Sequence, residues 1–228
     1  MKSNSTSPGR SPSHFVARLM TVGCLTLLLA CSSGCVGMLA QILHVGLGNN
    51  HPARFPGLKE KRVAVVCLSE SSAFGPSQAA SELAEKITTL VGRNVDKVQV
   101  ISQEAVSDWM DRNDWNELDY EEIGEGLHAD MVVGIELGGF SLHEGTTLYR
   151  GRADVTVTVY DITLGGRALF EDTMAEIVYP VNSGQYSTEI SETEFRRRFL
   201  NTLAFRVARN FYPYDATIDY GQDALMLE

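Results

Sequence analysis

The stretch Arg152-Ala-Asp-Val-Thr-Val-Thr-Val-Tyr-Asp-Ile162 has the clearest periodicity in this chain. Successive side chains of an extended backbone point to opposite sides. Small or apolar residues therefore share one side and mostly polar residues the other: Ala153, Val155, Val157 and Val159 against Asp154, Thr156, Thr158 and Tyr160. This alternation predicts an antiparallel strand with one face buried under helices and the other exposed to solvent or to a partner.

Neighbouring strands are predicted on both sides of this stretch. Thr163-Leu-Gly-Gly166 is typical of a turn, and residues 167–178 then return as the hairpin partner. On the N-terminal side, the largely apolar residues 130–137 predict another strand. Residues 138–151 lie between the two strands and include four glycines, which favours a hairpin connection.

The first half of the domain alternates strands with helices. Arg62-Val-Ala-Val-Val-Cys-Leu-Ser69 is short and almost continuously apolar, which predicts a buried strand. Apolar residues then recur at helical spacing from Ser77, a residue type favoured as an N-cap, to Val91. A second strand is predicted at 97–101. Two short helices follow, at 103–110 and 120–127.

The last element predicted is a long amphipathic helix over residues 192–211. Phe195, Phe199, Leu203, Val207 and Phe211 recur there at intervals of four, and Ser191 followed by Glu194 resembles a capping box. The element order is thus β-α-β-α-α-β-β-β-α. Parallel strands joined through helices, followed by an antiparallel hairpin, predict an α/β fold with a mixed parallel/antiparallel sheet and helices packed on it.

The N-terminal residues indicate export. A leader with Lys2, Arg10 and Arg18 and no acidic residue precedes the apolar run Leu19-Met-Thr-Val-Gly-Cys-Leu-Thr-Leu-Leu-Leu-Ala-Cys31, which ends in small residues. This order is typical of a secretory signal. A cysteine at the cleavage point resembles the signal of a bacterial lipoprotein, in which that cysteine is lipidated and becomes the first mature residue.

Two cysteines compete for the lipid. Leu28-Leu-Ala-Cys31 has an apolar residue at minus three and a small one at minus one, which favours Cys31 over Cys35. The other interpretation is an uncleaved anchor, because residues 19–47 are long enough to span a bilayer, although polar residues interrupt them. The predicted division is a signal peptide at 1–30, a tether at 31–61, an α/β domain at 62–212 and an acidic tail at 213–228.

Charge and cysteine content limit the partners. From Cys31 onward the chain holds 16 Lys and Arg against 29 Asp and Glu, a formal net charge of −13. This argues against nucleic acid or anionic lipid as a non-specific partner and suits a face that docks on a basic partner. Cys67 lies in an apolar run and is interpreted as a small buried side chain, and no disulfide framework is indicated.

Four segments together carry a resemblance to a family. They are the strand at 62–66, the helix at 77–91, Ile123-Gly-Glu-Gly-Leu-His-Ala-Asp-Met-Val-Val-Gly134, and the strand and turn at 154–166. The chain resembles the exported α/β domains of the curli-secretion lipoprotein, the lipoprotein activator of penicillin-binding proteins and the N-terminal domain of the Tol-system propeller protein. The resemblance covers about 62–180. It implies the fold more than the activity.

No catalytic set is recognisable in the sequence. The domain holds two histidines, His128 and His143, no cluster has metal-ligand spacing, and no nucleophile has an identifiable base. Ser69, Ser71 and Ser72 follow the first strand, where ligands bind in open α/β sheets, but without a partner for catalysis. We therefore expect no catalysis, cofactor or metal. An exported enzyme or a small-ligand-binding domain remains the alternative.

The predicted function is binding, as an adaptor or regulator tethered to the cell envelope by an N-terminal lipid. The partner is an envelope protein or a second copy of the chain. The candidate interface is the acidic and aromatic segment 108–122, together with the connection at 138–151. Trp109, Trp115 and Tyr120 lie within that segment, and aromatic residues among charges are typical of interaction surfaces.

We expect the mature chain to begin at a lipidated Cys31. Mass spectrometry of the mature N-terminus checks this. Cys31→Ser should abolish the lipid-modified form, because the thiol is the group modified, whereas Cys35→Ser should leave that form unchanged. A chain that retains an unmodified Met1, or one that starts well beyond Cys35, contradicts the prediction.

Overall fold

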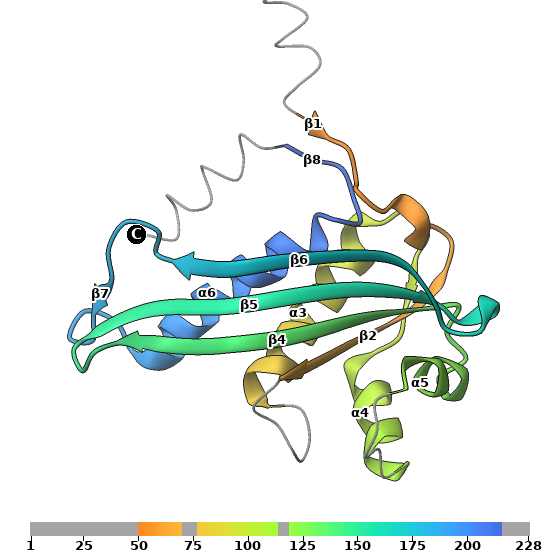
Figure 1. The fold of residues 1–228 in the computed structure, drawn as a ribbon, viewed down its shortest axis with the longest axis horizontal. Helices are drawn as coiled ribbons and strands as arrows, with labels where there is room; N and C mark the ends of the chain where they lie inside the picture. The colour runs from red at the N-terminus through yellow and green to blue at the C-terminus, as the bar shows by residue number, and fades with distance from the viewer. Residues whose placement is uncertain (1–49, 70–76, 114–118, 216–228) are drawn as a thin grey trace, which may run out of the picture. The chain divides into compact units, whose positions relative to one another are not determined.

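The computed structural model describes residues 50–69, 77–113 and 119–215 (Figure 1). The described residues from His51 onward belong to one compact unit, whose fold is given below. Its main strands are β2 (Arg62–Ser69), β3 (Gln99–Val100), β4 (Met131–Glu144), β5 (Leu148–Asp161) and β6 (Arg167–Tyr179). Its helices are α3 (Gln78–Asn94), α4 (Gln103–Arg112), α5 (Tyr120–Gly126) and α6 (Glu192–Ala208). Shorter elements are β1 (Asn50–His51), β7 (Gln185–Tyr186), β8 (Tyr214–Asp215) and the 3₁₀ turns η1 (Pro56–Leu58) and η2 (Ile162–Leu164).

The main sheet is mixed, as the sequence predicts. Its strand order is β3-β2-β4-β5-β6, and the short β7 also pairs with β5. β2 runs parallel to both β3 and β4, whereas β4, β5 and β6 are antiparallel to one another. In register, Val157 of β5 lies opposite Ile135 of β4 and Asp172 of β6. The predicted α/β class and the order of the main elements are confirmed.

Helices α3 and α6 cover one face of the sheet. Val155, Val157 and Val159 are fully buried beneath them, together with Phe195 and Phe199 of α6. The predicted facing of β5 is therefore confirmed, since Thr156 and Thr158 point to the other face and are half-buried. Cys67 is 4% exposed in the same core and forms no disulfide, as expected of a small buried side chain.

The opposite face is only partly covered. Helices α4 and α5 bury a smaller core there, in which Val106 and Ile123 pack on Ala64, Val66 and Val132 of the sheet. Figure 1 shows α4 and α5 near the end of the long strands where β5 leads into β6, with β4, β5 and β6 running on past them. The short helices α4 and α5 therefore leave part of this face uncovered.

The strands on either side of 138–151 form a hairpin, as predicted, but the predicted length of the connection is wrong. β4 continues to Glu144 and β5 begins at Leu148, so the turn occupies only residues 145–147. Of the glycines behind that prediction, Gly139 adopts φ +56° at a register shift of the β4–β5 ladder. Gly151 lies inside β5 under the Phe199 ring, and a Cβ there would stand 2.5 Å from Phe199 Cδ1. These two glycines thus allow a bulge and a close aromatic contact rather than a chain reversal.

Part of the predicted tether packs on the domain. Leu58 of η1 is fully buried in the larger core, and the backbone N–H of Phe55 donates to the carbonyl of Asn210 at 2.8 Å. Arg54 Nη1 lies 2.6 Å from Asp172 Oδ2 on β6. The apolar side chains of this segment therefore extend the core beyond the predicted start of the domain at 62. Helix α6 ends at Ala208 rather than 211, while Phe211 stays buried beyond it.

No helix within residues 50–69, 77–113 and 119–215 is both long and apolar enough to cross a bilayer.

We expect Val157→Asp to unfold the domain. Val157 is 0% exposed, and an unpaired carboxylate there should cost about 5 kcal/mol, which is comparable to the whole stability of a small domain. Thermal denaturation followed by circular dichroism measures the effect, expected to be a fall of more than about 10 °C in Tm. Thr156→Asp, one residue away on the other face, is the matched control and should change Tm little. Similar falls for both variants would contradict the assigned facing.

Candidate functional site

A cleft of about 550 Å³ opens on the partly covered face of the sheet. The end of β2 contributes Leu68 and Ser69, and the start of α5 contributes Asp119, Tyr120 and Glu121. β4 contributes Glu136, β5 contributes Tyr160, and Gly166 completes the lining. This is the carboxyl end of the parallel strand β2, where the sequence placed Ser69 at a potential ligand site. Ser71 and Ser72 lie outside the described residues.

Two stacked tyrosines form the wall of the cleft. The rings of Tyr120 and Tyr160 lie 4.6 Å apart between centroids, with 17° between their planes. Gly134 of β4 makes room for Tyr120, since a Cβ there would stand 2.7 Å from Tyr120 Cζ. Asp119 caps α5 by accepting hydrogen bonds from the backbone N–H groups of Glu121 and Glu122, which fixes where Tyr120 enters the helix.

Burial raises the pKa of both phenols. Tyr120 is 9% exposed, and removal from water is the largest cause of its raised pKa. The nearby Tyr160 and Glu136 raise the pKa of Tyr120 further. Burial is likewise the first cause of the raised pKa of Tyr160, to which Glu136 and Glu171 add. Both hydroxyls are therefore protonated and neutral at neutral pH.

Among the described residues that line the cleft, the charged side chains are all acidic. They are Asp119, Glu121 and Glu136, and no described lining residue is Lys or Arg. No ion pair within the described ranges involves any of these three carboxylates. The cleft therefore presents negative charge beside two aromatic rings.

The cleft continues into an exposed sheet surface that we call the open face. Its side chains come from three adjacent strands: Glu136 of β4, Asp154, Thr156 and Thr158 of β5, and Glu171 and Thr173 of β6. Thr156 lies opposite both Glu136 and Thr173, and its hydroxyl is 3.3 Å from that of Thr173. None of these six residues is basic, and the nearest arginines on the same side of β5, Arg150 and Arg152, are paired with Glu144. Glu136 belongs to both the cleft and the open face.

The predicted interface residues do not form one exposed patch. Tyr120 is buried in the wall of the cleft, and Trp109 is half-buried with its indole ring against Gly126. Trp115 lies outside the described residues, as do Cys31 and Cys35. The use of these residues for binding or lipidation stays a prediction.

Sequence reasoning missed Glu136 and Tyr160 as site residues. The available signal was Glu136 itself, a charged residue at an alternate position within an otherwise apolar strand. Tyr160 stood on the polar side of the alternating strand but was assigned no role. Only the register of β4 against β5 brings these two residues into one cleft.

A second hollow of about 580 Å³ lies between α3 and α6, and its charges are balanced. Lys86, Arg196 and Arg197 line it together with Glu82 and Glu85. Arg196 Nη2 lies 3.9 Å from Glu82 Oε1, a weak contact at the edge of ion-pair distance. This hollow has cations and anions in similar number, so it offers less net attraction to an ion than the cleft does.

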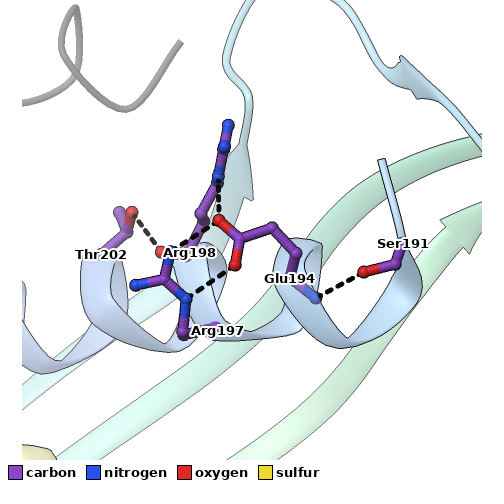
Figure 2. Close-up of polar contacts among 5 residues, drawn as sticks. All are labelled: Ser191, Glu194, Arg197, Arg198 and Thr202. Atoms are coloured by element: carbon purple, nitrogen blue, oxygen red, sulfur yellow. Dashed lines mark hydrogen bonds and ion pairs between the residues drawn. The ribbon is translucent and has the colours of Figure 1, made fainter. Parts of the chain in front are cut away.

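Figure 2 shows the ion pairs at the start of α6. The Ser191 hydroxyl accepts a hydrogen bond from the Glu194 backbone N–H at 3.2 Å, which confirms the N-cap half of the predicted capping box. The Glu194 carboxylate instead binds two arginines, with its Oε1 2.6 Å from Arg197 Nη2 and 2.9 Å from Arg198 Nε. Hydrogen bonds from these guanidinium groups lower the pKa of Glu194 to about 2.

Across the described ranges, no group of three or more His, Cys, Asp and Glu side chains is placed to hold a metal ion.

No family model and no curated protein matches the chain. Solved structures of similar fold include lipoprotein GNA1162 from Neisseria meningitidis, with a TM-score of 0.44 and 14% identity over 64% of this chain and 97% of that chain. A PelC dodecamer from Paraburkholderia phytofirmans has a TM-score of 0.41 and 11% identity over 72% and 98%. The LpoB C-terminal domain from Salmonella enterica has 0.38 and 12% over 53% and 85%. Lipoproteins are thus among the similar chains, and at these values no partner or activity is transferred.

We expect Glu194 to make stability depend on acidic pH. Its pKa is about 2 in the folded protein against an ordinary 4.5, so its contribution is complete above about pH 4.5 and is lost as the pH falls toward 2. Glu194→Gln should lower Tm at pH 7, and the gap from wild type should close by about pH 2. Thermal denaturation between pH 2 and 7 measures this.

The control is Glu104→Gln in the first turn of α4, where no ion pair within the described ranges involves the carboxylate. Its difference from wild type should vary less with pH. A gap for Glu194→Gln that stays constant down to pH 2 would contradict the assigned role of the two arginines.

Proposed function

We propose that this protein is a lipoprotein tethered to the bacterial cell envelope that acts as an adaptor or regulator by binding a basic envelope protein, without catalysis. The observation that carries the proposal is the open face. It is a polar, acidic sheet surface that extends from the cleft across three strands and that the helices of the described unit leave uncovered. The lipoprotein signal ending at Cys31 supports the tether.

Charge favours a basic partner over a second copy of the chain. Of the six residues that define the open face, Glu136, Asp154 and Glu171 are acidic and none is basic, while Arg150 and Arg152 farther along β5 are both paired with Glu144; the mature chain has a formal net charge of −13. A two-fold dimer through this face would set these carboxylates against their own copies, which is unfavourable. A partner with Lys and Arg at its surface would instead be complementary and would associate faster at low salt.

Two residues of the predicted interface, Tyr120 and Trp109, lie at or beside the cleft. Tyr120 forms the wall of the cleft, and Trp109 belongs to α4, which packs beside α5. We propose that Trp109 and Trp115 contact the partner at the rim of this surface. Tyr120 contributes through its hydroxyl and the shape of the cleft rather than as an exposed anchor.

Site-specific photocrosslinking in cells tests the proposed face. A benzophenone amino acid replaces Thr156 on the open face or, as the control, the exposed Ser81 on α3. We expect an adduct with another envelope protein from the Thr156 position and none from Ser81. Mass spectrometry should place the crosslink in a segment of the partner with net positive charge.

A charge reversal on the same face makes the test specific. Glu171 lies opposite Thr158, so Glu171→Lys should lower the adduct yield from the Thr156 position about tenfold through like-charge repulsion with the basic partner. An adduct of twice the chain mass would contradict the basic partner in favour of self-association. Equal adducts from Ser81, or no effect of Glu171→Lys, would contradict the assigned face.

A further inference from the structure

The outer edge of β6 has unpaired backbone groups. β6 is the last strand of the main sheet (Figure 1), and no strand among the described residues pairs with its outer side. Within the same part of the chain, no loop forms a backbone hydrogen bond with residues 168–174 from that side. The N–H and C=O groups along such an edge can pair with another extended segment. The edge therefore offers a binding surface that does not depend on any charged side chain.

The regular part of this edge is residues 170–174. They pair with β5 in unbroken register, and a register shift in the β5–β6 ladder lies at each end of this stretch. Glu171 and Thr173 within it lie opposite the open-face threonines of β5 and therefore point to the open face. A strand added along 170–174 would extend the open face by one strand, with every second side chain of the added strand on that face.

The two sides of this stretch differ in the charge that they leave unpaired. On the open face, Glu171 is exposed, and no ion pair within the described ranges involves its carboxylate. On the core side, the Asp172 carboxylate lies 2.6 Å from Arg54 Nη1 and accepts a hydrogen bond from Asn210 Nδ2 at 3.2 Å. A strand that fits this edge is therefore basic at the positions on the open face and uncharged at the positions between them.

Charge disfavours a second copy of this chain as the added strand. Residues 168–176 contain Glu171, Asp172 and Glu176 and no Lys or Arg. Two such edges paired with each other would gather like charges along their seam, which is unfavourable. The register shifts at both ends of 170–174 also limit the length over which the two edges could pair. A basic segment of a different protein avoids the like-charge contact.

We propose that the basic partner adds to β6 as an extended strand along residues 170–174, with Lys or Arg at alternate positions beside Glu171 on the open face. Backbone hydrogen bonds to the β6 edge hold the added strand, and its basic side chains set the register against Glu171. This inference rests on the proposed function, because it names how the basic partner attaches. It also goes further, since contact with the open face alone requires no added strand.

Calorimetric titration of the full mature protein in detergent micelles tests this mode of binding. The probe is an octapeptide of alternating lysine and threonine. One control peptide has the same composition with its lysines grouped at one end. The other has every backbone amide N-methylated, which keeps the charge and removes the N–H donors. We expect the alternating peptide to bind at least about tenfold more tightly than either control. Equal binding of the N-methylated peptide would overturn strand addition, and equal binding of the grouped peptide would overturn the alternating pattern.

Amide hydrogen exchange locates the added strand. The outward N–H groups of 170–174 exchange with solvent unless a strand pairs with them, so the alternating peptide should slow their exchange at least about tenfold. β3, at the opposite edge of the sheet, is the internal control and should show no change. Protection that is absent from β6, or equal in β3 and β6, would overturn the proposed edge.

Matched variants separate this edge from the general acidity of the protein. Glu171→Gln and Glu85→Gln each remove one exposed carboxylate, the first beside the edge and the second on α3 at the other face. Glu171→Gln should raise the Kd for the alternating peptide about fivefold, whereas Glu85→Gln should change it less than about twofold. Equal weakening by the two variants would overturn the site in favour of non-specific attraction.

The two proposals fail in distinguishable ways. If the Thr156 crosslink finds a basic partner but the alternating peptide leaves exchange in β6 unchanged, the adaptor function stands and strand addition is wrong. If the peptide protects β6 but no crosslink forms at Thr156, the β6 edge stands as a strand-binding site and the open face is not the docking surface.

Discussion

The strict alternation of side chains along β5 is the constraint on which both faces of this domain depend. β5 pairs with β4 on one side and β6 on the other, and its inward valines fill the core beneath α3 and α6. Because the period is two, burying Val155, Val157 and Val159 obliges Thr156 and Thr158 to point the other way. A slip of one residue would expose the valines and bury the threonines. The strand register that buries these valines therefore also determines which side chains form the open face.

The cleft arises where the cover of that second face stops. α6 has 17 residues and lies over β4, β5 and β6, whereas α5 has seven and contacts β4 and η2. The capping of α5 by Asp119 sets Tyr120 at the start of the helix, and the missing side chain of Gly134 lets its ring settle on the sheet. The cleft thus lies where a short helix begins on a wide sheet, with Tyr120 as the first packed residue of that helix.

Local periodicity was enough to predict the order of the elements, but not the functions of the glycines or the composition of the cleft. The β5 alternation and the phenylalanines at intervals of four in α6 report burial directly, so those elements were predicted with their correct facing. Glycine is ambiguous, because a turn and a close aromatic contact both select it, and the connection between β4 and β5 was predicted too long for that reason. The cleft joins Leu68, Tyr120, Glu136 and Tyr160, which are far apart in sequence. Their meeting depends on strand register and helix docking, which no local pattern encodes.

Two carboxylates among the described residues contrast with those of the cleft, because each is paired with arginine. Glu144 and Glu194 each bind two arginines, Glu144 with Arg150 and Arg152. The described lining of the cleft has three acidic residues and no arginine, although like charges held close together oppose folding. The chain segments next to it in sequence, 70–76 and 114–118, contain no Lys or Arg that could supply the balance. Neither the described lining residues nor these two adjoining segments therefore supply a basic side chain that would offset the carboxylates. A cation from outside the domain would relieve that repulsion, which couples binding at the cleft to the stability of the fold.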